Sequence, residues 1–191
     1  MDIVKNEHGT VLCKWHHDLQ DRRGLRASLR RSTTITEACL ADGFRLLLLQ
    51  THTLWNIERQ EWRFTALALV AAVAAHIKSI DERKTFAAQL GQKMNSRQAM
   101  SELRFRRLCE VKKPDDLLRQ LRRAVQLLNG TVNLSSLADD IFRWCREADD
   151  LHQHHRRQQP HTEFIRIRWA MDYYQAEHQD EKNPSVSAEQ E

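Results

Sequence analysis

The chain has 191 residues, of which glycine and proline together account for only eight, and 41% of its residues are hydrophobic. Tight hairpin turns depend on glycine and proline, so this composition argues against a strand-rich sandwich or barrel, and the apolar content is too high for a wholly disordered chain. Lys and Arg number 30 against 26 Asp and Glu, but residues 170–191 hold six of the acids and one base, which leaves 29 bases against 20 acids in residues 1–169. A basic body of this kind favours a polyanionic partner, although a solvated charged surface would give the same counts.

Helical periodicity begins near the N-terminus. Apolar side chains recur at helical spacing over residues 10–20, and a basic helical segment follows the interruption at Gly24. Thr34 and Glu37 have the spacing of a capping box, which predicts a helix that starts there and runs to about residue 54.

A second long helix is expected over residues 58–79. Its longest apolar run, residues 66–75, is half the length of a membrane span, so it indicates a buried core helix. The next stretch, residues 85–97, is expected to be a loop because Gly91 and Asn95 interrupt it.

The pattern is clearer in the second half. Residues 100–111 fit one helical face, and Pro114 ends that helix because proline disfavours the helical conformation of the residue before it. Residues 115–128 carry a strict apolar stripe that ends at Asn129-Gly130, a typical C-terminal stop. Two more helices are expected, one capped by Asn133 or Ser135 and one that begins at Pro160.

The predicted fold class is therefore all-α, with two small helical bundles. The helix break near Pro114 suggests the division: an N-terminal bundle over residues 1–113, a C-terminal bundle over 114–180 and a disordered acidic tail over 181–191.

No catalytic pattern is present. The sequence contains no phosphate-binding loop, dinucleotide fingerprint, nucleophile elbow or HExxH motif. Its carboxylates occur as the adjacent pairs Asp115-Asp116, Asp139-Asp140 and Asp149-Asp150, and neighbouring residues on a helix point in different directions. We therefore expect no enzymatic activity and no cofactor.

Cysteine and histidine give two weaker signals. The four cysteines are scattered without a CxxC pair, and the first residues lack a signal peptide, so reduced thiols in a cytoplasmic protein are expected. Four histidines lie close together, which raises the hypothesis of a zinc-dependent enzyme. A solvated connector is the favoured interpretation, because two arginines in the same stretch would repel a cation. These histidines are His152, His154, His155 and His161.

The five tryptophans fall mostly at apolar periodic positions. Core packing is therefore the default interpretation for them, and base stacking is the alternative. They are Trp15, Trp55, Trp62, Trp144 and Trp169.

Arginine clustering is the most informative feature. Three groups project from helices whose other face is apolar, and such groups can contact a phosphate backbone without reading its sequence. No helix-turn-helix or zinc-finger signature accompanies them, so the residues alone favour a non-specific nucleic-acid binder. The groups are Arg23, Arg26, Arg30 and Arg31; Arg104, Arg106 and Arg107; and Arg119, Arg122 and Arg123.

Five segments in this order resemble a known family: RGLRASLRR (23–31), MSELRFRRLCE (100–110), DLLRQLRRAVQLL (116–128), VNLSSLADDIFRW (132–144) and IRWAMDYY (167–174). This is the small subunit, called CasB, of the type I-E CRISPR interference complex Cascade. The resemblance implies an all-helical fold and no catalytic activity. It also implies partners: the backbone subunits and the large subunit of Cascade, a second copy of the chain, the guide RNA, and both strands of the opened target DNA.

The resemblance implies that the residues matching the family's segments contact nucleic acid. The family often has a Ser-Phe-Gly-Arg-like stretch before the second segment; residues 85–90 lack its Gly-Arg, and Lys93 and Arg97 are the candidates to substitute. The candidate nucleic-acid-binding residues are Arg23, Arg26, Arg30, Lys93, Arg97, Arg104, Arg107, Arg119, Arg122 and Arg123. The alternative function is a purely structural adaptor whose arginines pair with acidic surfaces of other subunits.

Overall fold

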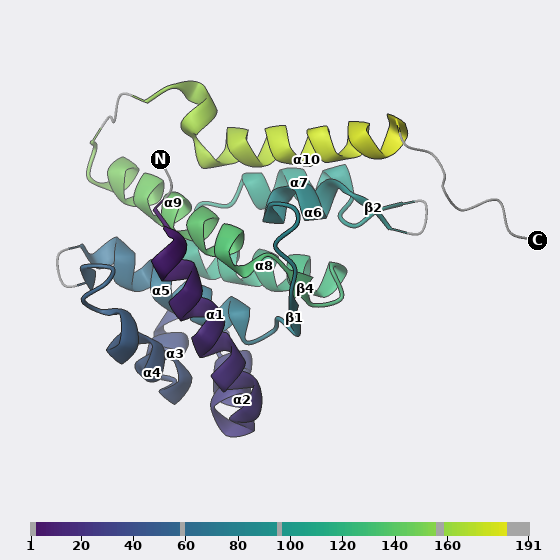
Figure 1. Cartoon of the computed structure of the whole chain (residues 1–191). Coiled ribbons are helices and arrows are strands. Elements are labelled where there is room, and N and C mark those ends of the chain that lie inside the picture. Colours follow the sequence, from purple (N-terminus) through teal and green to yellow (C-terminus); the bar gives the residue numbers. More distant parts are fainter. Residues whose placement is uncertain (1–2, 58–59, 95–96, 156–158, 183–191) are drawn as a thin grey trace, which may run out of the picture.

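The structure is a computed structural model that describes residues 3–57, 60–94, 97–155 and 159–182 (Figure 1). Most of these residues form helices, so the predicted all-α class is confirmed. The helices are α1 (Asn6–Asp21), α2 (Arg23–Arg31), α3 (Ile35–Leu40), α4 (Asp42–Thr51), α5 (Glu61–Ala74), α6 (Phe86–Gly91), α7 (Glu102–Cys109), α8 (Pro114–Leu127), α9 (Leu134–His152) and α10 (Ile165–Lys182).

The strands of the described chain are two residues long and join helix ends. Strand β1 (Ser79–Ile80) pairs in parallel with β4 (Thr131–Val132), directly after α5 and α8. Strand β2 (Lys93–Met94) pairs antiparallel with β3 (Arg97–Gln98) between α6 and α7. A 3-10 turn, His161–Glu163, precedes α10.

Helix α5 lies at the centre of the molecule. Residues 66–75 are all at most 2% exposed. This stretch is apolar on every face, so other helices must cover it on every side. Helices α9, α3, α8, α4 and α2 all pack against it. The predicted buried core helix is therefore confirmed, and no described helix is long and apolar enough to cross a membrane.

A second group of helices forms where α10 lies along α6 (Figure 1). Their backbones approach so closely at Gly91 that a Cβ atom there would lie 2.1 Å from the carbonyl oxygen of Tyr173. The Tyr173 ring stacks on Phe105 of α7 with 4.0 Å between centroids, and its hydroxyl donates to the Met100 carbonyl. These contacts hold α6, α7 and α10 together.

Each group of helices contains elements from before and after Pro114 in the sequence. Helices α8 and α9 follow Pro114 yet share a core with α5, and α10 packs on α6 from the N-terminal part of the chain. The division into residues 1–113 and 114–180 stays a prediction. Helix α10 continues through Lys182, and the rest of the expected acidic tail lies outside the described residues.

Several element predictions were wrong in detail. The helix expected over 58–79 ends at Ala74, and Ser79 lies in strand β1. The break expected at Gly24 falls at Arg22, and Gly24 lies inside α2. The helix expected from 34 to 54 is two helices, because the backbone of Ala41 is extended between them. The loop expected over 85–97 contains helix α6, whose first turn is capped by the Thr85 hydroxyl accepting the amide of Ala88. Pro160 precedes the 3-10 turn, and α10 begins at Ile165.

The predicted helix ends were more successful. The Thr34 hydroxyl accepts the amide of Glu37, and the Asn133 side chain accepts the amide of Ser136. Asn129 and Gly130 both have positive φ, as a stop at the end of α8 requires. All five tryptophans are buried, which confirms their core packing.

Candidate nucleic-acid interface

Helix α2 presents its arginines in two different ways. Arg23 and Arg30 are exposed, whereas Arg26 is half-buried. The guanidinium of Arg26 donates to the carbonyl oxygens of Ala75 (3.0 Å) and Ile77 (3.3 Å), just past the C-terminal end of α5. Burial lowers the pKa of Arg26, and the charge of Arg30 lowers it further. Arg26 is thus engaged within the protein, and Arg23 and Arg30 face outward.

Helix α8 shows the same division. Pro114 begins the helix and two aspartates lie in its first turn, where carboxylates are favoured by the helix dipole. Arg119 is paired with Asp116, one of those aspartates. Arg122 is half-buried and donates to the Leu29 carbonyl at 3.2 Å, while Arg123 is exposed.

The first and third arginine groups meet around His76, which follows α5. The fields of Arg122, Arg30 and Arg26 all act on this imidazole. Burial first, and then these three cations, lower the pKa of His76 to about 4. Residues separated by about a hundred positions in the sequence therefore form one cationic cluster, which we call the His76 cluster: Arg26, Arg30, Arg122 and His76.

Helix α7 carries the second group. Phe105 and Leu108 are buried beneath it, which leaves Arg104 and Arg107 exposed. Arg106 is paired with Glu102 at 2.6 Å, so its charge is already compensated. Helix α7 packs against α8, and the two helices thus bring Arg104, Arg107 and Arg123 onto neighbouring elements.

Lys93 and Arg97 lie apart from the three helical groups, on the β2–β3 hairpin. The register pairs Lys93 with Gln98 and Met94 with Arg97, so the two basic residues are diagonal neighbours. Both are exposed. The hairpin is anchored because the Gln98 side chain lies 3.1 Å from the Tyr173 hydroxyl, within hydrogen-bond distance.

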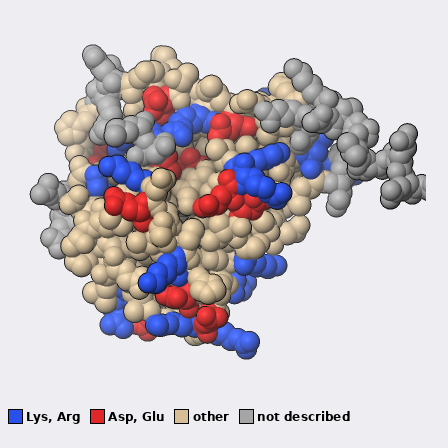
Figure 2. Space-filling model, in the orientation of Figure 1, with Lys and Arg blue, Asp and Glu red and all other residues tan. Residues whose placement is uncertain are grey.

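The surface in view is mixed in charge. Figure 2 shows Lys and Arg interspersed with Asp and Glu, with several basic side chains at the lower end, where α2 lies in Figure 1. A polyanion would therefore meet separate groups of cations rather than a continuous positive field on this face.

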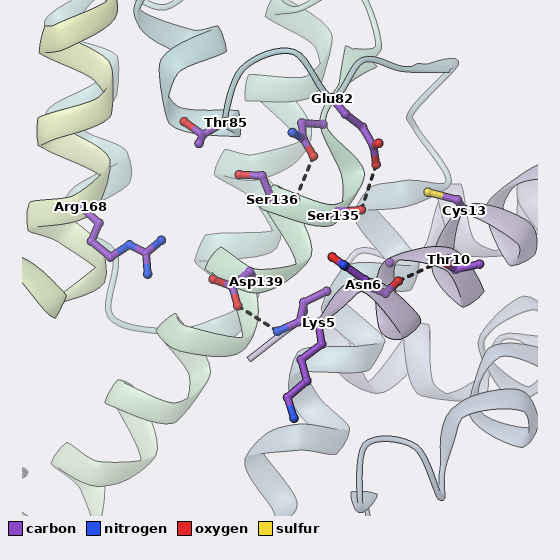
Figure 3. A pocket seen from close by; sticks show the side chains of 13 residues that line it. Lys5, Asn6, Thr10, Cys13, Glu82, Thr85, Ser135, Ser136, Asp139 and Arg168 are labelled. Carbon is purple, nitrogen blue, oxygen red and sulfur yellow. Dashed lines mark hydrogen bonds between the residues drawn. The ribbon is translucent and has the colours of Figure 1, made fainter. Parts of the chain in front are cut away.

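A pocket of about 690 Å³ opens where the first turns of α1 and α9 meet α10 and the segment before α6 (Figure 3). Its polar lining is largely hydrogen-bonded within the protein. Asp139 accepts the backbone amides of Ile3 and Val4, and the Ser135 hydroxyl donates to Glu82 at 3.2 Å. The lining residues labelled in Figure 3 are Lys5, Asn6, Thr10, Cys13, Glu82, Thr85, Ser135, Ser136, Asp139 and Arg168.

The nucleophile of this pocket is not activated. Burial and the nearby carboxylate of Glu82 raise the pKa of the Cys13 thiol, so it stays protonated at neutral pH. Asp139 is engaged with Arg143, whose Nε donates to it at 2.6 Å. Asp139 and Arg143 therefore act as structural partners of each other.

The histidine-rich stretch is exposed where it is described. His152, His154 and His155 lie at the end of α9 and beyond it, and His161 begins the 3-10 turn. The structure places no group of three or more His, Cys, Asp and Glu side chains at metal-binding distance within the described ranges.

Comparison with known proteins identifies the family. The family model for "CRISPR-associated protein Cse2" matches residues 25–174. The chain is also 30% identical over 137 residues to the CRISPR-associated protein Cse2 of Thermus thermophilus, which covers 70% of this chain and 69% of that protein. The chain belongs to the Cse2 family. No solved structure matches it.

Cse2 is the small subunit of type I-E Cascade that is also called CasB, so the resemblance found in the sequence is confirmed. The matched region of this Cse2 chain includes every candidate contact residue except Arg23, which lies two residues before it. The match supports the family and does not assign a contact to any single arginine.

His76 is the residue that the sequence did not reveal. It directly follows the apolar run 66–75, so its spacing suggests only the polar end of a core helix. The sequence offered one indirect signal. His76 is a titratable residue just past the end of a core helix, and the basic helices must pack over that end.

Proposed function

We propose that this Cse2 chain is a non-catalytic subunit of Cascade that holds nucleic-acid backbones without reading their sequence. It stabilises the guide RNA–target DNA R-loop, including the displaced strand, in the cytoplasm. Its partners are the backbone and large subunits, a second copy of itself, the guide RNA and the target DNA. R-loop formation is a nearly balanced strand exchange, so a few backbone contacts are enough to shift it.

The observation that carries this proposal is the exposed arginine set on α7 and α8. Arg104, Arg107 and Arg123 project from rigid helices that pack together, and no hydrogen bond or ion pair engages them in the part of the chain that the structure describes. Such a guanidinium breaks no internal contact when it meets a phosphate, which its planar fork can contact through two parallel hydrogen bonds.

The test uses the assembled complex with the double variant Arg104→Ala/Arg107→Ala. We expect its affinity for target DNA to fall by about tenfold or more, because each charge-assisted contact to phosphate is worth about 1.5 kcal/mol or more. The matched control is Arg45→Ala/Arg83→Ala, which removes two exposed arginines that are paired with Asp42 and Asp81. The control should change DNA affinity by less than about twofold, because exposed arginines that are already paired contribute little free energy.

The outcomes separate the two functions. Weaker DNA binding by an intact complex supports strand holding. Loss of the subunit from the complex in size-exclusion chromatography would instead support the structural adaptor, because the arginines would then be needed by protein partners. Unchanged DNA affinity in an intact complex would remove these two residues from the interface.

A further inference from the structure

The His76 cluster combines residues of α2, α8 and the segment after α5. Arg30 is exposed, and Arg26, Arg122 and His76 are half-buried, so the cluster lies within reach of solvent. Two of its members are fixed by the protein: Arg26 to the carbonyls of Ala75 and Ile77, and Arg122 to the carbonyl of Leu29. The backbone thus holds the guanidinium groups near one another.

Polar atoms of the cluster are left without partners. Both Nε2 of His76 and Nε of Arg122 are buried and make no hydrogen bond in the described structure. Buried polar atoms are nearly always satisfied in folded proteins, and an unsatisfied one costs free energy. Two such atoms leave hydrogen-bonding capacity unused within the cluster.

The charge around His76 is also unbalanced. Arg26 and Arg30 act on it from α2, and Arg122 from α8. From α1, His16 and Gln20 approach the same carbonyl of Ile77, and both are uncharged partners at neutral pH.

The nearest carboxylate on α3 is already engaged. Glu37 acts on Arg122 across space, but its side chain accepts the amide and hydroxyl of Thr33. Glu37 keeps its negative charge and offsets part of that of Arg122, so three guanidinium groups face this one carboxylate and the cluster stays net positive.

We propose that the His76 cluster is a binding site for one phosphate group of a nucleic-acid backbone. Arg30 and Arg122 contact the phosphate oxygens, and Arg26 positions α2 against the end of α5. His76 lies behind these arginines and becomes protonated when the anion offsets their charge. This inference rests on the proposed function, and it assigns one subsite of the interface to a defined set of residues.

The site has a signature that an ordinary basic patch lacks. In the unliganded chain, burial and the three arginines keep the imidazole neutral at pH 7. A bound anion, whether a backbone phosphate with one negative charge or sulfate with two, offsets those charges, so the anion raises the pKa of His76, and by linkage anion affinity increases as pH falls.

The experiment follows the His76 ring signals by NMR in the full chain, with sulfate added against chloride at constant ionic strength. Sulfate serves as the probe because its charge does not change with pH in this range. We expect sulfate to move the His76 titration to higher pH, and Arg30→Ala to weaken sulfate binding by about tenfold, the equivalent of one charge-assisted hydrogen bond. Arg83→Ala, which removes an exposed arginine paired with Asp81, is the charge-matched control. A His76 titration that is the same in sulfate and chloride overturns the proposal.

A second arm identifies the source of the anion. A single-stranded DNA oligonucleotide should displace sulfate and reproduce the His76 shift, whereas displacement by a glutamate-rich peptide alone would overturn the phosphate assignment in favour of a protein carboxylate. If the chain binds the oligonucleotide while the His76 signals do not respond, this subsite is wrong and the proposed function stands. If sulfate binds at His76 but no oligonucleotide binds at low salt, the proposed nucleic-acid function fails instead.

Discussion

Arg26 illustrates how a basic residue can serve the fold rather than a ligand. Its two hydrogen bonds place a positive charge at the C-terminal end of α5, where the helix dipole favours cations and carbonyls lack helical partners. Arg26→Ala leaves those carbonyls without this donor, so we expect the free energy of unfolding in urea to fall by about 2 kcal/mol. Arg23→Ala on the exposed face of the same helix should change it by less than about 0.5 kcal/mol. Equal losses in the two variants would contradict a structural role for Arg26.

His76 gives the protein a pH-dependent component of stability. Its pKa of about 4 in the folded chain lies below the ordinary value of 6.5, so the unfolded state binds a proton first as pH falls. Stability from this group is present above pH 6.5 and is lost as the pH falls toward 4. We expect the unfolding free energy of His76→Gln to decrease less over this window than that of the parent chain. His152→Gln, at an exposed position, should follow the parent, and parallel curves for all three proteins would remove His76 as the cause.

At the scale of elements, local patterns predicted most helices because their determinants lie within a few residues. The stripe and stop signals of α8 needed only neighbouring side chains, and the cap at Asn133 is a contact across three positions. The failures depended on distant partners. Gly91 appears as a loop signal in the sequence, yet it lies at the end of α6 because no side chain fits between α6 and the Tyr173 backbone.

The packing of α6 on α10 therefore depends on the missing side chain of Gly91. In Gly91→Ala the new methyl group would lie 2.1 Å from the Tyr173 carbonyl oxygen, which forces the two helices apart. We expect a loss of about 3 kcal/mol or more in unfolding free energy and faster amide exchange in α10, measured by hydrogen–deuterium exchange. Gly24→Ala is the matched control, since no atom lies within 4 Å of its would-be Cβ. It should be neutral or slightly stabilising through higher helix propensity, and a similar loss in both variants would contradict the packing argument.

At the scale of the whole molecule, the sequence predicted which helices are basic but not which arginines are available to a ligand. Spacing along α2 cannot distinguish Arg26 from Arg30, because the difference comes from the carbonyls beyond α5 that only Arg26 reaches. Arg122 differs again: it donates to the Leu29 carbonyl, 93 residues away, while its Nε has no hydrogen-bond partner in the described structure. Availability is a tertiary property, and it depends on which carboxylates and carbonyls the fold brings to each guanidinium.

Two arginines on one helix make that difference measurable. Arg119 and Arg123 are both exposed on α8, but Arg119 is paired with Asp116 whereas Arg123 has no acidic partner in the described chain. Each phosphate neutralised by a fixed cation releases counterions and adds about 0.7 to 0.9 to the slope of log affinity against log salt. If Arg123 makes such a contact, Arg123→Ala should reduce the slope for binding of the purified chain to single-stranded DNA by about that amount. Arg119→Ala should reduce it less, because Asp116 already compensates its charge and would repel the strand. A larger effect at Arg119 than at Arg123 would show that intramolecular pairing does not decide which arginines bind the strand.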